Sequence, residues 1–400
     1  MVLWASDLCI APGVYDDNTV VFIACVSGQH CVAIDNRYSQ CQVEEVTTGS
    51  SPVTPVTNAD STDFVKTSGQ QFILNGSRFT VVGSNSYWVG LTGLNTTDMN
   101  KAFTDIAKTG ATVVRGFNEV TTASPGIPYY QSWSGSTPTV NTGSDGLRNF
   151  DNVVAAARAN GIRLIVALTN NWADYGGMDV YVNQIVGNGQ PHHLFYTNEN
   201  VIAAYKDYIS AFVGRYKNEP TIMAWELATI TKWASDISAY IKSIDVNHLV
   251  ALGDEGFFNR PQNIFASWPY RGGDGIDFDA NLQISTLDFG TVHSYPITWA
   301  QIFNPASWGT KWIQDHAASQ QAADKPVILE EFGITFSQSS IYATWLETVI
   351  SSGLTGDLIW QSGSNLNDGQ RTPDDGYTIY PDGPVYPIIT SHAAALKARD

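Results

Sequence analysis

The sequence predicts an α/β protein of the (β/α)8, or TIM, barrel class on two observations. From residue 63 onward, short apolar runs alternate with segments whose apolar residues recur every three to four positions, which is typical of parallel strands alternating with helices. Eight such units fit into about 330 residues, enough for a parallel sheet to close on itself. A doubly wound open sheet is the alternative, but it calls for a Gly-rich phosphate loop where the chain reads Gly83-Ser-Asn-Ser.

The elements can be assigned in chain order. Strands are expected at 79–83, 111–114, 163–168, 221–227, 248–252, 286–292, 326–329 and 357–360, and helices at 97–109, 147–160, 201–216, 231–244, 307–321, 340–352 and 389–398. The helix at 147–160 illustrates the pattern, because Phe150, Val153 and Ala157 share one stripe and Gly161 follows as a stop signal.

Composition limits the possible partners. The net charge of −17 argues against nucleic acid, whose affinity comes largely from Lys and Arg on phosphates. The sequence contains no run of about 18 apolar residues, so it predicts no membrane span. The chain has 12 Trp, 18 Tyr and 17 Phe, and we expect those outside the core to stack on flat ligands such as sugar rings. These features favour a secreted protein that acts on a neutral polymer.

The cysteines mark a separate segment at the N-terminus. All four lie in the first 41 residues, at Cys9, Cys25, Cys31 and Cys41, which predicts a disulfide-bonded module in an oxidising compartment. Zinc binding is the alternative, but no Cys-x-x-Cys pair is present. Residues 1–7 do not form a convincing signal peptide, since they lack a basic start and a clean apolar run.

The spacing Cys25-x5-Cys31-x9-Cys41 and the ending Tyr38-Ser-Gln-Cys41 resemble the C-terminal half of a family 1 carbohydrate-binding module. That resemblance implies cellulose as a ligand, although Arg37 stands where the family usually presents a second aromatic ring. We therefore expect a degenerate module at 1–42, a Ser/Thr/Pro linker at 43–62 and a catalytic domain at 63–400.

Polar and aromatic residues follow nearly every predicted strand. Because active sites of such barrels lie at the carboxyl ends of the strands, these residues should share one pocket. They stand in the runs Asn85-Ser-Tyr-Trp88, Arg115-Gly-Phe-Asn-Glu119, Thr169-Asn-Asn-Trp172, Gly253-Asp-Glu255, His293-Ser-Tyr295, Glu330-Glu331 and Trp360-Gln361.

Over about residues 63–395 the chain resembles the fungal and plant endo-β-1,4-mannanases of glycoside hydrolase family 5. The most specific motifs are Asn170-Asn-Trp-Ala-Asp-Tyr-Gly-Gly-Met178, Pro220-Thr-Ile-Met-Ala-Trp-Glu-Leu-Ala228, Asn247-His-Leu-Val-Ala-Leu-Gly-Asp-Glu-Gly-Phe257, Leu329-Glu-Glu-Phe-Gly333 and Asp375-Gly-Tyr-Thr-Ile-Tyr380. The resemblance implies a secreted, retaining hydrolase of β-mannan (galactomannan or glucomannan) with no cofactor or metal, and we expect a monomer.

The resemblance also implies roles for single residues. The nucleophile precedes an aromatic residue and a glycine, which indicates Glu331 rather than Glu330, and strand alternation lets only one of the two face the pocket. Tyr295 would orient that carboxylate, and His293 would belong to the hydrogen-bond network beside it. The charge of Arg115 would keep the carboxylate ionised. The residues expected to contact sugar are Trp360 as a platform at the cleavage point and Asn85, Trp88, Asn170 and Trp172 along the cleft.

The chain departs from the family at two strand ends. The strand at 221–227 should be followed by Asn-Glu-Pro, whose Glu is the acid/base, but Ala228 continues into Thr229-Ile-Thr. Glu226 is a weak substitute, since it lies about four residues deeper, roughly 13 Å along a strand. Two residues, one aromatic, are also missing after Arg115. A catalytically impaired carbohydrate-binding protein and a β-1,4-glucanase therefore remain alternatives to a mannanase.

Overall fold

A computed structural model describes residues 63–117, 127–171, 173–228, 230–260 and 267–400, together with the backbone of four short strands ahead of them. The chain divides into two compact units, residues 1–57 and 58–400, which are described separately. The predicted linker falls almost wholly outside the described residues.

The N-terminal unit contains two antiparallel strand pairs. Strand β1 (Leu8–Ile10) pairs with β2 (Phe22–Ala24), and β3 (Gln29–Asp35) pairs with β4 (Tyr38–Val43). In the second pair the Cα atoms of Cys31 and Cys41 are register partners. The four cysteine side chains lie outside the described residues, so the predicted disulfides and cellulose contacts stay predictions.

The larger unit is built on eight parallel strands in the order β14-β13-β12-β9-β8-β17-β16-β15, which confirms the predicted barrel. The strands are β8 (Val81–Asn85), β9 (Val113–Phe117), β12 (Arg163–Ala167), β13 (Ile222–Leu227), β14 (Leu249–Leu252), β15 (Gly290–Ser294), β16 (Val327–Phe332) and β17 (Gly356–Ile359). Parallel strands buried on both faces read as continuous apolar runs, which explains why the sequence shows little alternation within them.

The barrel closes between β14 and β15 through scattered hydrogen bonds. The amide of Asp288 donates to the Val250 carbonyl at 2.9 Å, and the amide of His293 donates to the Glu255 carbonyl at 3.3 Å. The Thr291 hydroxyl oxygen accepts the amide of Asp254 at 3.0 Å. This boundary, called the seam below, has no ladder pairing, unlike the other boundaries of the described barrel.

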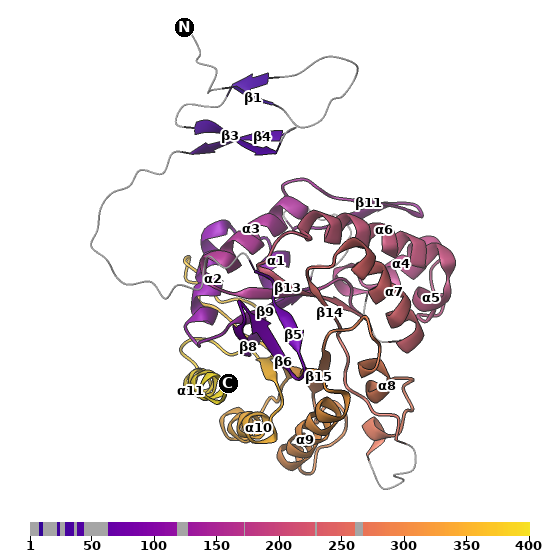
Figure 1. Ribbon diagram of the computed structural model, residues 1–400, viewed down its shortest axis with the longest axis vertical. Helices are drawn as coiled ribbons and strands as arrows, with labels where there is room; N and C mark the ends of the chain where they lie inside the picture. The colour runs from indigo at the N-terminus through magenta and orange to yellow at the C-terminus, as the bar shows by residue number, and fades with distance from the viewer. Residues whose placement is uncertain are drawn as a thin grey trace, which may run out of the picture. The chain divides into compact units, whose positions relative to one another are not determined.

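Helices surround the strands, with α2, α3, α6 and α7 on one side and α9, α10 and α11 on the other (Figure 1). They are α1 (Trp88–Leu91), α2 (Thr96–Ala107), α3 (Leu147–Ala159), α4 (Met178–Ile185), α5 (Leu194–Thr197), α6 (Glu199–Tyr216), α7 (Thr231–Ile244), α8 (Phe278–Leu282), α9 (Pro305–Ala323), α10 (Gln338–Ser352) and α11 (Tyr386–Arg399). Helix α2 begins where the side chain of Asn95 accepts the amide of Asp98, so its start follows from an ordinary cap. None of the described helices is long and apolar enough to cross a membrane.

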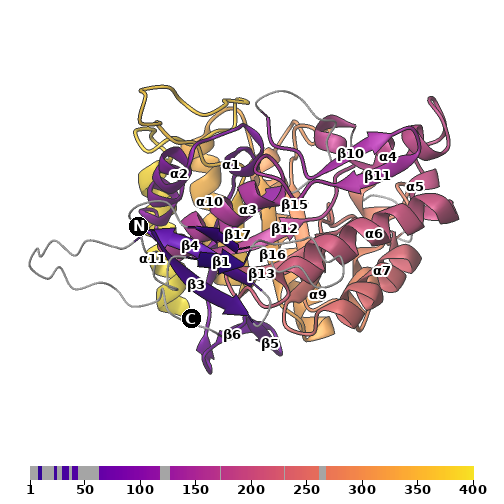
Figure 2. The same cartoon turned by 90° about the horizontal axis from the view of Figure 1, so that it is seen from above.

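Two additions to the barrel were not predicted. The strands β5 (Lys66–Ser68), β6 (Gln71–Leu74) and β7 (Ser77–Arg78) form a small sheet ahead of the first barrel strand. A hairpin of β10 (Gln131–Ser134) and β11 (Thr137–Val140) lies beside α4 and α6 (Figures 1 and 2).

Several strands have bounds that differ from the predicted ones. The strand expected at 79–83 is β8, because Phe79 instead bonds back to Phe72 of β6 and the ladder runs on through Asn85. Likewise β15 begins at Gly290 rather than at 286, and β16 includes both Glu330 and Glu331. Polar side chains of the site therefore stand on ladder residues, where their direction is fixed by the sheet.

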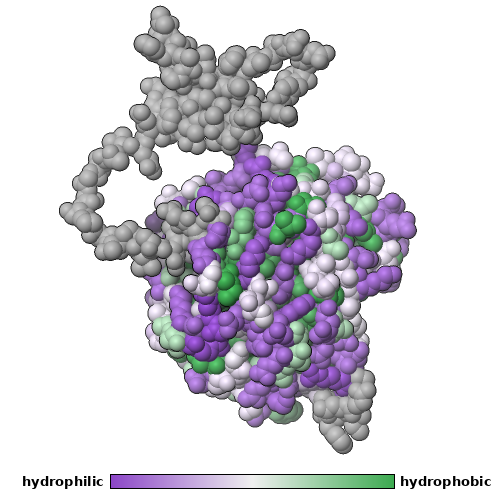
Figure 3. Space-filling model, in the orientation of Figure 1, coloured by the Kyte–Doolittle hydropathy of each residue, from purple (hydrophilic) through white to green (hydrophobic). Residues whose placement is uncertain are grey.

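The barrel interior holds an apolar cluster that joins strand residues from opposite sides. Its members include Phe72, Val81, Val113, Ile165, Met223, Leu249, Phe289, Ile328 and Leu358. On the face of the larger unit shown in Figure 3, apolar residues form separate patches between hydrophilic ones. The apolar residues are thus used mainly for the core.

Candidate active site

Arg115, on β9, joins the carboxyl ends of three other strands. Its Nε and Nη2 donate to both oxygens of Glu226 at 2.6 and 2.5 Å, and its Nη1 donates to Asn85 Oδ1 at 2.9 Å. The same Nη1 also donates to Oε1 of Glu331. The guanidinium is buried, so these bonds form in a medium of low dielectric and hold the strands in fixed relation.

Glu331 has both carboxylate oxygens engaged by donors. Besides the bond from Arg115, Oε2 accepts the hydroxyl of Tyr295 at 2.8 Å, and His293 Nε2 lies 3.7 Å from Oε1. Burial raises the pKa of Glu331, but the charges of His293 and Arg115 and the Tyr295 bond outweigh it, so the pKa lies below its ordinary value. With 8% of its surface exposed, this is an ionised carboxylate that keeps slight contact with solvent.

Glu330 precedes it and behaves in the opposite way. It is 0% exposed, and burial raises its pKa to about 8. Its Oε2 lies 3.3 Å from His293 Nε2 and 3.5 Å from Arg115 Nε, whereas Oε1 is buried without a hydrogen-bond partner. The carboxyl group is therefore held back from solvent beside the same two cations.

The ladder around the two glutamates does not follow simple strand alternation. Leu329 pairs with Val292, but Glu331 pairs with His293, so Glu330 is an extra residue in the ladder. Such a bulge re-aims the neighbouring side chains, which explains why both carboxylates reach Arg115 while Glu331 keeps 8% of its surface exposed and Glu330 keeps none.

His293 connects these carboxylates with a third on the other side of the seam. Its Nδ1 lies 3.6 Å from Oε2 of Glu255, which follows β14, while Nε2 faces Glu330 and Glu331. Burial lowers the pKa of His293, but the negative charges of Glu331 and Glu255 prevail and the pKa is raised well above its usual value. Burial, followed by the charge of Glu331, also raises the pKa of Tyr295, which keeps its hydroxyl protonated as a donor.

Trp360, directly after β17, is held in place at the edge of the site. Its Nε1 and the side-chain amide of Gln361 donate to Oδ2 of Asp375 at 2.8 and 2.9 Å. Tyr87 stacks on its indole ring, with centroids 5.9 Å apart and planes 11° apart. Tyr87 also contacts Tyr175, at a centroid distance of 5.4 Å, so three aromatic rings form a continuous half-exposed row.

Two predicted cleft residues are in the core. Trp88 is 0% exposed and donates its Nε1 to the Ser362 carbonyl, because helix α1 begins there and turns the side chain inward. Asn85 is also fully buried, and its amide nitrogen donates to the carbonyls of Glu330 and Ile359. Neither lines the cleft; Asn85 instead supports Arg115.

The remaining predictions divide by position. Asn170 is half-buried and its carbonyl accepts the amide of Met178, which fixes the start of α4, while Trp172 lies outside the described residues. Sequence reasoning missed Tyr87, although it belongs to the same run as Trp88. The run alone did not show which ring faces outward, because the short α1 was not predicted.

Glu226 does not substitute for the missing acid/base. It is 3% exposed and lies inside β13 with both oxygens on Arg115. A Cβ at Gly253 would lie 2.3 Å from Oε1 of Glu226, so β14 passes close over the carboxylate. The next acidic residue in the sequence is Asp236, on α7, so the end of β13 presents no carboxylate of its own.

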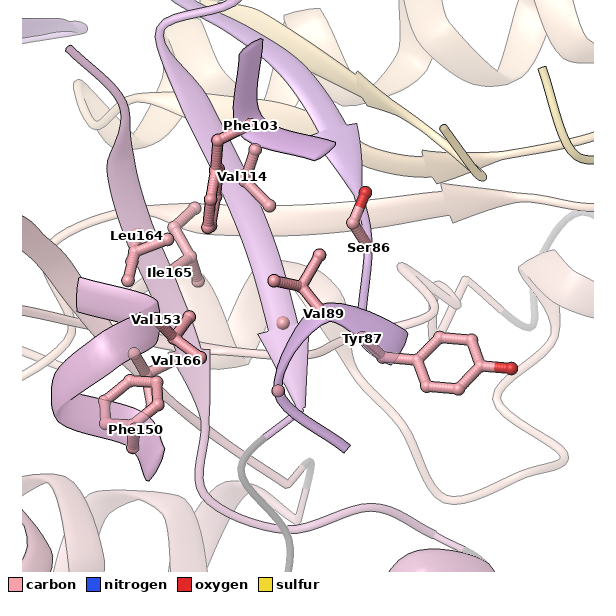
Figure 4. Close-up of a pocket in the computed structure, with 12 residues that line it drawn as sticks. Ser86, Tyr87, Val89, Phe103, Val114, Phe150, Val153, Leu164, Ile165 and Val166 are labelled. Carbon is pink, nitrogen blue, oxygen red and sulfur yellow. The ribbon is translucent and has the colours of Figure 1, made fainter. Parts of the chain in front are cut away.

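The second gap adjoins a small apolar cavity. About 20 Å³ is empty between β9, β12, α1, α2 and α3, and Gly116 borders it directly after Arg115. A Cβ added at Gly116 would meet no atom within 4 Å. Figure 4 shows Val89, Phe103, Val114 and other apolar side chains around the cavity, with the Tyr87 ring pointing away from it.

In the described part of the chain, no group of three or more His, Cys, Asp or Glu side chains is arranged to hold a metal ion. What the site offers chemically is one ionised, partly exposed carboxylate with a cation and a hydroxyl donor on it. That arrangement suits attack on an electrophilic carbon.

Comparison with known proteins gives consistent matches. The sequence model described as GH family 5 beta-mannosidase-like matches residues 62–352. Mannan endo-1,4-beta-mannosidase A of Aspergillus aculeatus is 40% identical over 364 residues, covering 87% of this chain and 94% of the relative. The enzyme of the same name from Podospora anserina is 40% identical over 351 residues, covering 83% and 91%. The crystal structure of the endo-1,4-beta-mannanase from Rhizomucor miehei has a TM-score of 0.77 and 37% identity, covering 84% of this chain and all of that one.

Proposed function

The chain belongs to glycoside hydrolase family 5, in its β-mannosidase-like group, and from that premise we propose that it hydrolyses internal β-1,4-mannosidic bonds of mannans. The reaction is a retaining one, with Glu331 as the nucleophile. The observation that carries the proposal is the setting of Glu331, whose oxygens accept bonds from Arg115 and Tyr295 and whose pKa is lowered. The named activity of the relatives supplies the substrate class.

The first half of the reaction joins Glu331 to the sugar. An oxygen of Glu331 attacks the anomeric carbon and forms a glycosyl ester, while the bond to the leaving sugar breaks. The bonds from Arg115 and Tyr295 keep the carboxylate ionised and aimed before attack, so little reorganisation is needed at the moment of reaction. Trp360, held by Asp375, provides an apolar face for the sugar ring at the cleavage point.

We extend the proposal to the substrates and the location. Galactomannan or glucomannan is the polymer, cellulose is a ligand of the N-terminal segment, and the protein acts outside the cell as a monomer without a cofactor. Support for the first point comes from the relatives, which are mannanases, and for the second from the cysteine spacing at 25–41.

Two measurements test this function. Reducing-sugar release from linear β-1,4-mannan should exceed release from cellulose, and a reversed preference would favour the β-1,4-glucanase. A 2-fluoro manno-oligosaccharyl fluoride, which reacts without a proton donor, should trap the ester on the peptide that contains Glu331. A label on another carboxylate would contradict the assignment.

The alternative of a binding protein without hydrolytic activity has one specific observation in its favour, the absence of a carboxylate after Glu226 at the end of β13. It is tested by comparing the chain with a variant that carries Asn-Glu-Pro inserted after Ala228. If mannan binds to both but only the inserted variant releases reducing ends, the binding protein is the correct description.

A further inference from the structure

We propose that Glu255 supplies the proton to the leaving sugar in this chain, in place of the carboxylate missing from the end of β13. The inference rests on the proposed retaining reaction at Glu331 and names the second residue that this reaction needs. General acid catalysis by such a group is typically worth about 10²–10⁴-fold.

Glu255 stands at the carboxyl end of a barrel strand and shares His293 as a neighbour with Glu331. It follows β14, and its side chain is 40% exposed. One oxygen, Oε2, is buried without a hydrogen-bond partner and lies 3.6 Å from His293 Nδ1. Since the side chain as a whole is partly exposed while Oε2 is not, its other oxygen is the one available to a ligand.

His293 sets an upper bound on the distance between Glu255 and the nucleophile. His293 Nδ1 lies 3.6 Å from Glu255, and Nε2 of the same ring lies 3.7 Å from Oε1 of Glu331. The two carboxylates are thus separated by at most these two contacts and the width of one imidazole ring. That upper bound includes the roughly 5–5.5 Å separation that the proposed retaining reaction requires, whereas separations of roughly 6.5–9.5 Å belong to inverting enzymes.

The other carboxylates around the pocket are already committed. Glu226 has both oxygens on Arg115, and Glu330 is fully buried. Asp254 is buried with both oxygens hydrogen-bonded, and Asp375 accepts two side-chain N–H bonds on one oxygen. Among these acids, Glu255 is partly exposed, and its carboxylate has His293 Nδ1 as a neighbour at 3.6 Å.

Glu255 acts first as an acid and then as a base. Glu255 takes up the proton that His293 Nδ1 holds beside it and gives that proton to the glycosidic oxygen as the bond to the anomeric carbon breaks and the ester to Glu331 forms. In the second half, the Glu255 carboxylate takes a proton from water, the water oxygen bonds to the anomeric carbon, and Glu331 leaves as a carboxylate.

The test compares substrates that differ only in their need for a proton. With the full chain, Glu255→Ala should lower kcat/KM on mannopentaose by about 10²–10⁴-fold, but by less than about tenfold on 2,4-dinitrophenyl β-mannobioside. Azide should restore turnover of the dinitrophenyl substrate by this variant and yield a β-mannosyl azide. The near-isosteric Glu255→Gln should show the same selective loss, and Glu347→Ala, an exposed acid on α10, should show none.

Several outcomes would overturn the assignment. An equal loss on both substrates would mean a structural role for Glu255, and full activity of Glu255→Ala on mannopentaose would exclude it while leaving the proposed function intact. A selective loss in Glu119→Ala instead would assign the proton to that residue, which lies outside the described part. If the parent chain cleaves the dinitrophenyl substrate but not mannopentaose, no residue of the chain supplies the proton. If the parent cleaves neither substrate, the proposed function fails and the inference fails with it.

Discussion

The ends of β16 and β13 both place a glutamate on Arg115, but they use it differently. On β16 the bulge leaves Glu331 with 8% of its surface exposed and with donors on both oxygens. On β13 Glu226 takes two bonds from the guanidinium and is buried, and no further carboxylate follows it. The comparison shows that a buried ion pair can persist for the packing of the barrel while the adjacent reactive position is lost.

The largest expected difference lies between two adjacent residues given the same substitution. Glu331→Gln should lower kcat/KM on mannan by a factor on the order of 10⁴–10⁶, because the nucleophile is removed. Glu330→Gln should change it by less than about tenfold, because a carboxyl whose pKa is raised to about 8 is already largely neutral at the pH of a mannan assay near 5. Steady-state kinetics of the pair checks this, and similar losses in both variants would contradict the distinction drawn at the bulge.

Removal of the shared cation should have the next largest effect. Arg115→Met leaves the buried carboxylates of Glu226 and Glu331 without their partner and should lower the free energy of unfolding by about 3–5 kcal/mol. The matched control is Arg215→Met, whose pair with Asp151 is partly exposed and should cost less than about 1 kcal/mol. Urea unfolding of both variants measures the difference, and equal losses would mean that Arg115 does not organise the site.

A smaller effect is expected from the hydroxyl on the nucleophile. Tyr295→Phe removes one donor to a charged group, worth about 1.5–3 kcal/mol, so kcat/KM should fall by about 10- to 100-fold. Without that donor the pKa of Glu331 should rise, and the acidic limb of the pH–rate profile should move to higher pH. A fall in rate with no movement of that limb would indicate a contact with substrate rather than with Glu331.

The buried glutamate should also appear in the pH dependence of stability. The folded-state pKa of Glu330, about 8, lies above its ordinary value of 4.5, so between these values the folded state binds more protons than the unfolded one. Its contribution to stability is complete below the lower value and is lost as the pH rises through the higher one. The unfolding free energy of the parent should therefore fall more steeply from about pH 5 to pH 8 than that of Glu330→Gln. Parallel curves would mean that Glu330 is ionised in the fold.

The smallest effect is expected at the second gap. Gly116→Ala should raise the free energy of unfolding by about 0.4–1 kcal/mol, because the unfolded chain loses freedom and the added methyl group meets open space. The backbone of Gly116 is not among those with positive φ, so alanine can adopt it. Gly253→Ala is the opposite control, since its Cβ would lie 2.3 Å from Glu226, and it should destabilise. Thermal unfolding of both variants checks the contrast.

Much of the fold could be predicted because apolar periodicity reports burial directly. Helix α7 has the predicted bounds, and α3 differs from its prediction by one residue. The strand starts were harder, since apolar residues such as Phe79 pack on neighbouring strands outside the ladder. The outer strands β5 to β7 and β10 to β11 were missed because short, half-exposed strands carry weak patterns.

For the site, the resemblance to glycoside hydrolase family 5 implied that Arg115, His293, Tyr295 and Glu331 lie together, and the structure has them together. It could not show which neighbour of a motif residue turns outward. The bulge at Glu330 and the inward turn of Trp88 both depend on local backbone geometry.

The seam between β14 and β15 gives the barrel a preferred line of opening. Fewer backbone bonds cross it than cross the paired boundaries, so local opening there requires less free energy than elsewhere around the sheet. Glu255 and His293 lie on opposite sides of that line. The amide hydrogens of Asp288 and His293, which cross the seam, would then exchange ahead of those in the paired ladders. An opening along this line would separate Glu255 from His293 while the paired strands kept their ladders.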